Sequence, residues 1–294
     1  MAESYAGGRD AFEVLPKRSP DSHKGDHGRL LVVGGSSRYV GAPAMVGLAA
    51  LRSGVDLATI AAPEKVAWAI NSISPDLITI KLMCEDIEPR DVPGLVWELE
   101  RATAVVVGPG LGTLKKTRKA VLGLAVAMRK KYPKLPALFD ADGLKALASG
   151  GRLTKGMPWV LTPHAGEFKI LTGLNLPSDL QGCIKMVKSA ARKFGCVILL
   201  KGQIDIIASP AGNVNLNSTG NPGMTVGGTG DVLAGIVGAF LSQGAKPFKA
   251  AVAGAWINGR AGDLCLKEKG YEFIASDLIA KLPDVFAEIR GRKR

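Results

Sequence analysis

The chain has 294 residues, of which 47% are hydrophobic and 37 are glycine. This composition supplies enough apolar material for a core, so it excludes a chain that is disordered throughout. The formal net charge of +12 suggests an anionic partner such as nucleic acid or a nucleotide, although a solvated basic surface explains the charge equally well.

Short apolar runs alternate with helical stretches along most of the chain. Helices are expected over residues 42–52, 114–131 and 178–193, and they dominate after Asp231. Because strands separated by helices form parallel sheets that are covered on both faces, the pattern predicts an α/β fold. We expect one domain over residues 21–294, preceded by a loose N-terminal arm over residues 1–20. The expected strands are residues 30–33, 56–61, 76–82, 104–107, 137–139, 159–161, 197–200 and 205–208.

Two polar or glycine-rich segments follow strands in the first half of the chain. Residues 108–112 read Gly-Pro-Gly-Leu-Gly and follow a strand directly, which is where parallel sheets meet their ligands. The segment is not GxGxxG, and no GxxxxGK[ST] occurs, so neither Rossmann dinucleotide binding nor P-loop chemistry is supported. Asp140 and Asp142 follow the next strand and could bind a metal or cap a helix.

Two further strand ends carry charged side chains. His164 follows the strand at 159–161 and could contact a ligand or cap the next helix. Glu167, in the first turn of that helix, could hold Mg²⁺ through water or complement the helix dipole. Lys201 and Gly202 close the strand at 197–200; they suit contact with a phosphate or an adenine edge, or they form a simple turn.

The most distinctive segment is the glycine-rich turn at 221–230, which runs directly into an apolar helix. Converging backbone N–H groups and the helix dipole make such a turn an anion site. Asp231, expected at the first helical position, could take a proton from a substrate hydroxyl or act only as an N-cap. Gly235 and Gly238 cost stability in a helix interior, so they predict a very close core contact.

The remaining features concern compartment and partners. No run of about 18 apolar residues occurs, so no membrane span is expected. The four cysteines form no CxxC pair, which predicts reduced thiols in a cytoplasmic protein. Basic residues over 115–134 and 290–294 could grip a phosphate backbone, but aromatic residues are only 5% of the chain, and nucleic acid is not favoured as the main partner.

Taken together, these segments resemble a known family. Their order and spacing are similar to those of the ADP/ATP-dependent NAD(P)H-hydrate dehydratases, which are ribokinase-like enzymes of nicotinamide nucleotide repair. The resemblance extends over about residues 10 to 290. It is carried by residues 22–29, 34–36, 39–42, 108–112, 140–142, 162–167, 201–202 and 221–235.

The resemblance implies a three-layer α/β/α fold with a mostly parallel central sheet. It also implies that the S epimer of hydrated NADH or NADPH is restored to NAD(P)H at the expense of ADP or ATP, with Mg²⁺. The ring hydroxyl would be phosphorylated and then eliminated as phosphate, leaving AMP when ADP is used. An alternative within the same superfamily is a small-molecule kinase that acts on hydroxymethylpyrimidine or hydroxyethylthiazole.

The resemblance also implies roles for individual residues. Asp231 would be the catalytic base, and Glu167 would help to hold Mg²⁺ through water. The hydrated nicotinamide nucleotide would contact Ala42, Gly110, Gly112, His164 and Asp231. The adenine nucleotide would contact Lys201, Gly202, Gln203, Ile204, Asp205, Gly227, Gly228, Thr229 and Gly230.

Many family members carry an additional N-terminal epimerase domain, for which the residues before position 25 are too few. We therefore expect a dehydratase that works with a separate epimerase. The resemblance also favours ADP over ATP and a homotetramer.

Overall fold

The computed structural model describes residues 4–15, 18–151 and 153–291. Helices and strands alternate along most of this part of the chain, as the sequence predicts. The strands are β1 (Ser4–Tyr5), β2 (Arg29–Val33), β3 (Leu57–Pro63), β4 (Ile78–Leu82), β5 (Ala104–Val107), β6 (Ala137–Phe139), β7 (Trp159–Leu161), β8 (Val197–Leu200), β9 (Asp205–Ala208) and β10 (Val214–Asn217).

The helices follow the strands in turn. Short 3-10 helices are η1 (Pro89–Asp91), η2 (Pro222–Thr225) and η3 (Gly270–Glu272). The α-helices are α1 (Gly8–Val14), α2 (Gly41–Arg52), α3 (Glu64–Ile73), α4 (Val92–Glu98), α5 (Lys115–Lys131), α6 (Ala141–Leu147), α7 (Ala165–Thr172), α8 (Leu180–Phe194), α9 (Thr229–Ser242), α10 (Pro247–Lys269) and α11 (Ala275–Ile289).

The ten strands form one sheet in the order β1-β10-β9-β8-β7-β6-β5-β2-β3-β4. Strands β2 to β8 run parallel, whereas β9 is antiparallel to both of its neighbours. The chain builds outward from β2 to β4, then returns to the other side of β2 and continues from β5. The order therefore reverses between β2 and β5, which is where open α/β sheets bind ligands.

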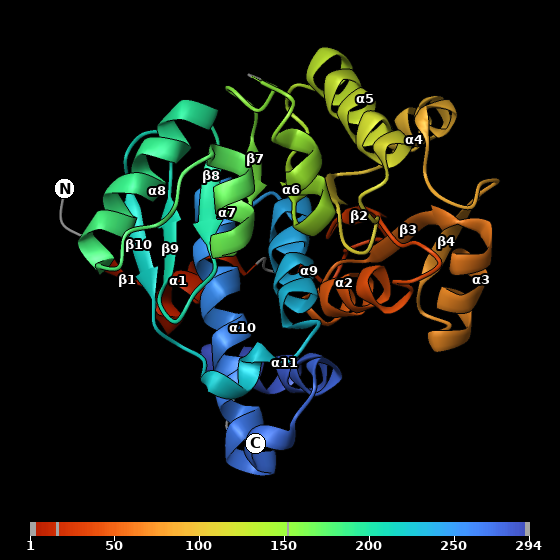
Figure 1. Ribbon diagram of the computed structural model, residues 1–294. Helices are drawn as coiled ribbons and strands as arrows, with labels where there is room; N and C mark the ends of the chain where they lie inside the picture. The colour runs from red at the N-terminus through yellow and green to blue at the C-terminus, as the bar shows by residue number, and fades with distance from the viewer. Residues whose placement is uncertain (1–3, 16–17, 152, 292–294) are drawn as a thin grey trace.

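Helices cover both faces of the sheet (Figure 1), so successive strand residues enter different cores. Leu30 and Val32 pack in the core formed with α2, α9, α10 and α11. Leu31 and Val33 pack in the core formed with α4 to α8. Burial on both faces explains why the strands read as continuous apolar runs. The mostly parallel α/β architecture is confirmed.

Two strand boundaries differ from the sequence-based expectation, and one strand was not expected. Strand β3 ends on Pro63, which also serves as the N-cap of α3, whereas the strand was expected to stop two residues earlier. Strand β4 begins at Ile78 rather than at residue 76. Strand β10 is absent from the prediction, since its sequence Val-Asn-Leu-Asn places two polar residues in a buried strand.

The N-terminal arm is not loose where the structure describes it. Strand β1 pairs with β10, and the Ala6 amide donates to the Leu216 carbonyl at 2.7 Å. In α1, Ala11 is fully buried in the core that includes α10 and α11. The expectation failed because these contacts join positions that are about 200 residues apart, which local sequence patterns do not report.

Gly235 and Gly238 bring α9 close to its neighbours, as their position in a helix interior predicts. A Cβ atom at Gly235 would collide with the Val46 carbonyl oxygen of α2, and one at Gly238 would lie 2.7 Å from Val106 of β5. The two glycines therefore allow α9 to pack on both α2 and the sheet. This packing positions the N-terminal end of α9 at the switch point.

Within the described residues, no helix is long and apolar enough to cross a membrane. All four cysteines carry free thiols. Most of the basic stretch over residues 115–134 lies on α5. The acidic residues Asp86 and Glu88 pair with Lys116 of this stretch. Residues 292–294 of the basic tail lie outside the described residues.

Candidate active site

The loops that follow β2 and β5 meet at the switch point. The Gly35 amide donates to the Pro109 carbonyl at 2.9 Å. Gly110 has a φ of +70°, and a Cβ atom there would lie 2.8 Å from the Tyr39 carbonyl oxygen and 3.2 Å from the Ala42 Cβ. Glycine is required at this close approach. Ala42 and Gly110, both expected to contact the substrate, are therefore neighbours in space.

Asp140 and Asp142 follow β6, and neither caps α6 through its side chain. The Asp142 carboxylate accepts from the Gly112 amide at 2.8 Å and from Lys145 Nζ at 2.8 Å, so it fixes the loop that carries Gly112. Between the two acids, Ala141 has a φ of +48° and is the one non-glycine residue with positive φ among those described. Such strained backbone concentrates at functional sites.

His164 and Glu167 form a capping box at the start of α7. His164 Nδ1 accepts from the Gly166 amide at 3.0 Å and from the Glu167 amide at 3.3 Å. In return, the Glu167 carboxylate accepts from the His164 amide at 3.0 Å. The helix cap that was one alternative for His164 is thus present. Its half-exposed ring also lines a cavity of about 830 Å³.

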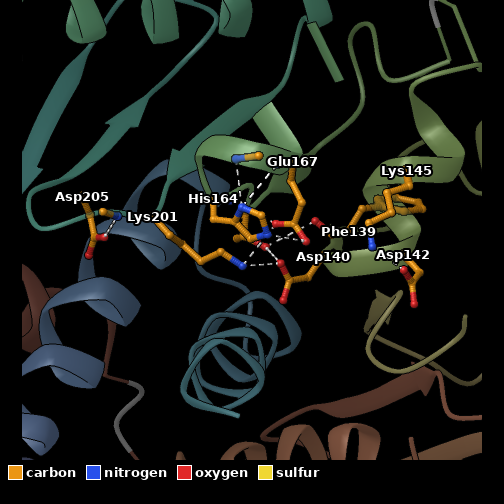
Figure 2. A network of polar contacts seen from close by, with 11 residues as sticks. Phe139, Asp140, Asp142, Lys145, His164, Glu167, Lys201 and Asp205 are labelled. Atoms are coloured by element: carbon orange, nitrogen blue, oxygen red, sulfur yellow. Dashed lines mark hydrogen bonds and ion pairs between the residues drawn. The ribbon is translucent and has the colours of Figure 1, made fainter. Parts of the chain in front are cut away.

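Lys201 follows β8 and joins two acids that follow the neighbouring strands β6 and β7 (Figure 2). Its Nζ donates to Asp140 Oδ1 at 2.7 Å and lies 3.7 Å from Glu167 Oε2. Asp140 Oδ1 also accepts from Thr162 Oγ1 at 2.9 Å. Burial lowers the pKa of Lys201, but the carboxylates around it outweigh this effect and raise the pKa above its usual value. Lys201 therefore remains charged in the site.

Asp231 is the third residue of α9, not the first, because the helix begins at Thr229. Its N-cap is Gly228, which has a φ of +98° and makes no side-chain cap hydrogen bond. The reading of Asp231 as only an N-cap is therefore wrong. Burial raises the pKa of Asp231 to about 7, the charge of Asp140 adds to the rise, and Lys201 opposes it. A carboxylate with such a pKa can accept a proton near neutral pH.

A cavity of about 830 Å³ opens beside Asp231. The cavity is lined by the five residues for which contact with the adenine nucleotide was expected, namely Lys201, Gly202, Gln203, Ile204 and Asp205. Thr229 and Gly230 complete the wall at the start of α9, whereas Gly227 and Gly228 are not part of the lining. The other lining residues are His164, Ser218, Thr219, Gly220, Asn221, Pro222, Met224, Thr225, Leu233, Ala255, Asn258 and Gly259.

Asp205 is a buried acid in this cavity. Burial raises the pKa of its carboxyl to about 6, although hydrogen bonds from Asn217 and the Gly202 amide and the charge of Lys201 counteract the effect. The Asn217 amide donates to Asp205 at 2.9 Å and the Gly202 amide at 3.0 Å. The carboxylate thus holds the turn after β8 in place at the cavity wall.

Sequence reasoning missed the contribution of α10, which supplies Ala255, Asn258 and Gly259 to the cavity. No motif marks these residues, and a polar side chain in a long apolar helix was the single available signal. From the sequence, Asp140 could be either a metal ligand or a helix cap. The structure shows that its carboxylate accepts a hydrogen bond from Lys201. In the part of the chain that is described, no three His, Cys, Asp or Glu residues gather into a metal cluster.

Comparison with known proteins adds independent findings. A profile of the NAD(P)H-hydrate dehydratase family matches residues 30–284. The bifunctional NAD(P)H-hydrate repair enzyme Nnr of Pyrobaculum aerophilum is 48% identical over 97% of this chain and 55% of its own length. The chain thus spans about half the length of this relative. The ADP-dependent (S)-NAD(P)H-hydrate dehydratase of Cenarchaeum symbiosum is 39% identical over 97% of each chain.

Solved structures show the same fold. The ADP/ATP-dependent NAD(P)H-hydrate dehydratase from Bacillus subtilis, co-crystallized with ATP/Mg²⁺, superposes with a TM-score of 0.81 at 28% identity, covering 98% of this chain and 99% of that one. A hydroxyethylthiazole kinase from Pyrococcus horikoshii OT3 reaches a TM-score of 0.60 at 18% identity, covering 95% and 92%. The second likeness extends to the ribokinase-like fold alone.

Proposed function

Because the chain belongs to the NAD(P)H-hydrate dehydratase family, we propose that it restores the S epimer of hydrated NADH or NADPH to NAD(P)H at the expense of ADP or ATP. The observation that carries the proposal is the position of Asp231. This carboxylate has a pKa of about 7 and stands at the helix end that borders the nucleotide-sized cavity, close to the glycine loops of the switch point.

Asp231 is the proposed catalytic base. With the substrate over Ala42, Gly110 and Gly112, its carboxylate takes the proton of the ring hydroxyl. The hydroxyl oxygen then attacks the terminal phosphorus of the nucleotide, and the bond from that phosphorus to the bridging oxygen breaks. With ADP the leaving group is AMP. The phosphorylated hydroxyl finally departs as phosphate with the electron pair of its bond to the ring carbon. A proton leaves the neighbouring ring carbon, and the electrons of that C–H bond form the ring double bond, so the net change in the ring is the loss of water.

The negative charge of the transferred phosphoryl group is stabilised by Lys201 and by the turn that contains Gly227, Gly228, Thr229 and Gly230. The position of a Cβ atom on Gly230 lies 3.5 Å from Lys201 Nζ, so the ammonium stands against the first turn of α9. Backbone amides at a helix N-terminus favour phosphate. Together they support binding of the transferred phosphoryl group and stabilisation of its charge.

Mg²⁺ is proposed to arrive with the nucleotide. Protein sites commonly hold Mg²⁺ through one or two carboxylates together with phosphates and water. Asp140 and Glu167 would supply these two carboxylates. Both lie close to Lys201 Nζ, at 2.7 Å and 3.7 Å, and therefore close to each other. Glu167 already accepts from the His164 amide, which favours contact through water. When bound, the ion neutralises phosphate charge.

We further propose a cytoplasmic homotetramer that works with a separate epimerase, and we favour ADP over ATP. The free thiols of all four cysteines fit a reducing compartment. A second repair activity beside the dehydratase is supported by the names of the bifunctional NAD(P)H-hydrate repair enzymes that this chain matches. The preference for ADP is supported by the ADP-dependent dehydratases of Cenarchaeum symbiosum and Nitrosopumilus maritimus.

The test is recovery of reduced-nicotinamide absorbance from chemically hydrated NADPH with Mg²⁺ and either ADP or ATP. We expect recovery with at least one nucleotide and none from Asp231→Asn, whose binding of AMP should stay near that of the unmodified protein because the phosphate turn is backbone. No recovery with either nucleotide would overturn the proposed function. Near-normal rates in Asp231→Asn would overturn the assignment of the base.

A further inference from the structure

The inner wall of the nucleotide-sized cavity holds a polar side chain with an unpaired atom. Asn258 of α10 is only 7% exposed and lines the cavity. Its Oδ1 is buried and has no hydrogen-bond partner among the described residues. An unpaired buried polar atom costs about 1–3 kcal/mol. A ligand that supplies the missing partner would remove this cost.

The surroundings of Asn258 suit a flat aromatic ring. Leu233 and Ala255 are buried apolar residues of the same wall, and Ile204 lies on the other side of the cavity after β8. Gly259 packs directly on Thr219, so no side chain from that position fills the space. An apolar wall with few placed polar groups is typical of sites that take a heterocyclic ligand.

Asn258 lies on a different element from the groups that suit phosphate. Lys201 and Gly230 are neighbours and border the acids Asp140 and Glu167. The segment of α10 that carries Asn258 instead contacts the chain after β10, where the Ala255 carbonyl accepts from Asn217 and the Trp256 carbonyl from Thr219. With the phosphates placed at Lys201, the wall that α10 contributes to the cavity is available to the base.

We propose that Asn258 selects adenine as the base of the nucleotide co-substrate. The inference rests on the proposed function, because it takes the cavity to be the nucleotide site. A carboxamide offers one acceptor and one donor side by side, which matches the exocyclic amine and N7 of adenine. A 6-oxo purine presents two acceptors at the same edge, and one carboxamide cannot satisfy both in either orientation.

The experiment compares the dissociation constants of ADP and inosine diphosphate by titration calorimetry, with Mg²⁺ and without hydrate. The unmodified protein should prefer ADP by about tenfold or more, which is within the range of a two-bond base contact. Asn258→Leu should weaken ADP binding by about that factor, leave inosine diphosphate nearly unchanged, and bring the ratio close to one. Asn258→Asp, which keeps the acceptor but loses the donor, should reduce the ratio partly.

Asn215→Leu is the matched control. Asn215 is also a buried asparagine with an unpaired Oδ1, but it lies in β10 and does not line the cavity. It should keep the preference for ADP. Asn258→Leu should also melt no earlier than the unmodified protein, because an apolar replacement removes the unpaired atom.

Equal binding of both nucleotides by the unmodified protein, or an unchanged ratio in both Asn258 variants, would overturn the assignment of Asn258. Such results would leave turnover of hydrated NADPH untouched. Loss of turnover with both ADP and ATP would overturn the proposed function instead.

Discussion

Replacing Asp140 by Asn should move the acid limb of the pH–rate profile to lower pH. Asp140 Oδ1 accepts from Lys201 Nζ at 2.7 Å and from Thr162 Oγ1 at 2.9 Å, and an amide oxygen can accept from both donors. The change therefore removes a negative charge and keeps the hydrogen bonds. Burial raises the pKa of Asp231 to about 7, with a further contribution from Asp140, so the pKa of Asp231 should fall in the variant.

The size of the effect follows from the ionised fraction of the base. A nearby charge moves a carboxyl pKa by about 1 or more. If the pKa of Asp231 falls from about 7 to about 6, the ionised fraction at pH 6 rises from about one tenth to about one half. The ratio of turnover at pH 6 to turnover at pH 8 should therefore rise about fivefold. This ratio reports the ionisation of the base even if the loss of a carboxylate that contacts Mg²⁺ lowers the rate at every pH.

Lys201→Met is the opposing variant. The charge of Lys201 lowers the pKa of Asp231, so its removal should move the acid limb to higher pH. Initial rates of NADPH recovery, measured from pH 5 to 9 at saturating hydrate and ADP, give both profiles. A loss of fold would lower the rates of both variants without moving the limbs in opposite directions. Limbs that stay in place, or move the same way, would refute the electrostatic argument.

Three further predictions test stability and metal dependence. The raised pKa of Asp231 implies stability that is present below about pH 4 and is lost as pH rises to about 7. Asp231→Asn should therefore stabilise the fold by up to about 4 kcal/mol at pH 8 and not at pH 4; thermal unfolding that shows no such dependence contradicts it. Gly235→Ala should destabilise the fold by about 1–3 kcal/mol in urea unfolding, because the added Cβ atom meets the Val46 carbonyl oxygen. The control Gly94→Ala, which has open space around it, should be neutral or slightly stabilising. Equal effects of the two substitutions would be inconsistent with the packing of α9. Chelation of Mg²⁺ should abolish turnover and leave AMP binding intact, and persistent turnover would argue against a metal-dependent transfer.

The local patterns of the sequence were enough to predict the parallel sheet and the glycine-rich turn. Strands such as β5, β6 and β7 are apolar on both faces because helices cover both, and this leaves a continuous run in the sequence. The turn before α9 can be recognised in the sequence by its adjacent glycines, which are typical of a turn that presents backbone amides at a helix end. The resemblance to the family implied that Lys201 and Gly230 contact the adenine nucleotide, and both line the cavity.

Contacts between distant segments could not be predicted in this way. Asp140 and Lys201 are 61 residues apart, and only the parallel alignment of β6, β7 and β8 brings their ends together. The docking of β1 on β10 pairs Ser4 with Asn215 and Tyr5 with Leu216, which lie far apart in the sequence. Asn258 reaches the cavity because α10 packs beside α9, and nothing in its local sequence distinguishes it from an ordinary helical asparagine.

The sequence by itself therefore determined the class of fold, the order of the motifs and the identity of the proposed base. Hydrophobic periodicity and turn chemistry are local properties, and they can be read from neighbouring residues. The tertiary structure alone decided how deeply Asp231 is buried and which charges surround it, and hence that the pKa of its carboxyl is raised to about 7. Burial and charge act through space, so they depend on which distant strands and helices converge at the site.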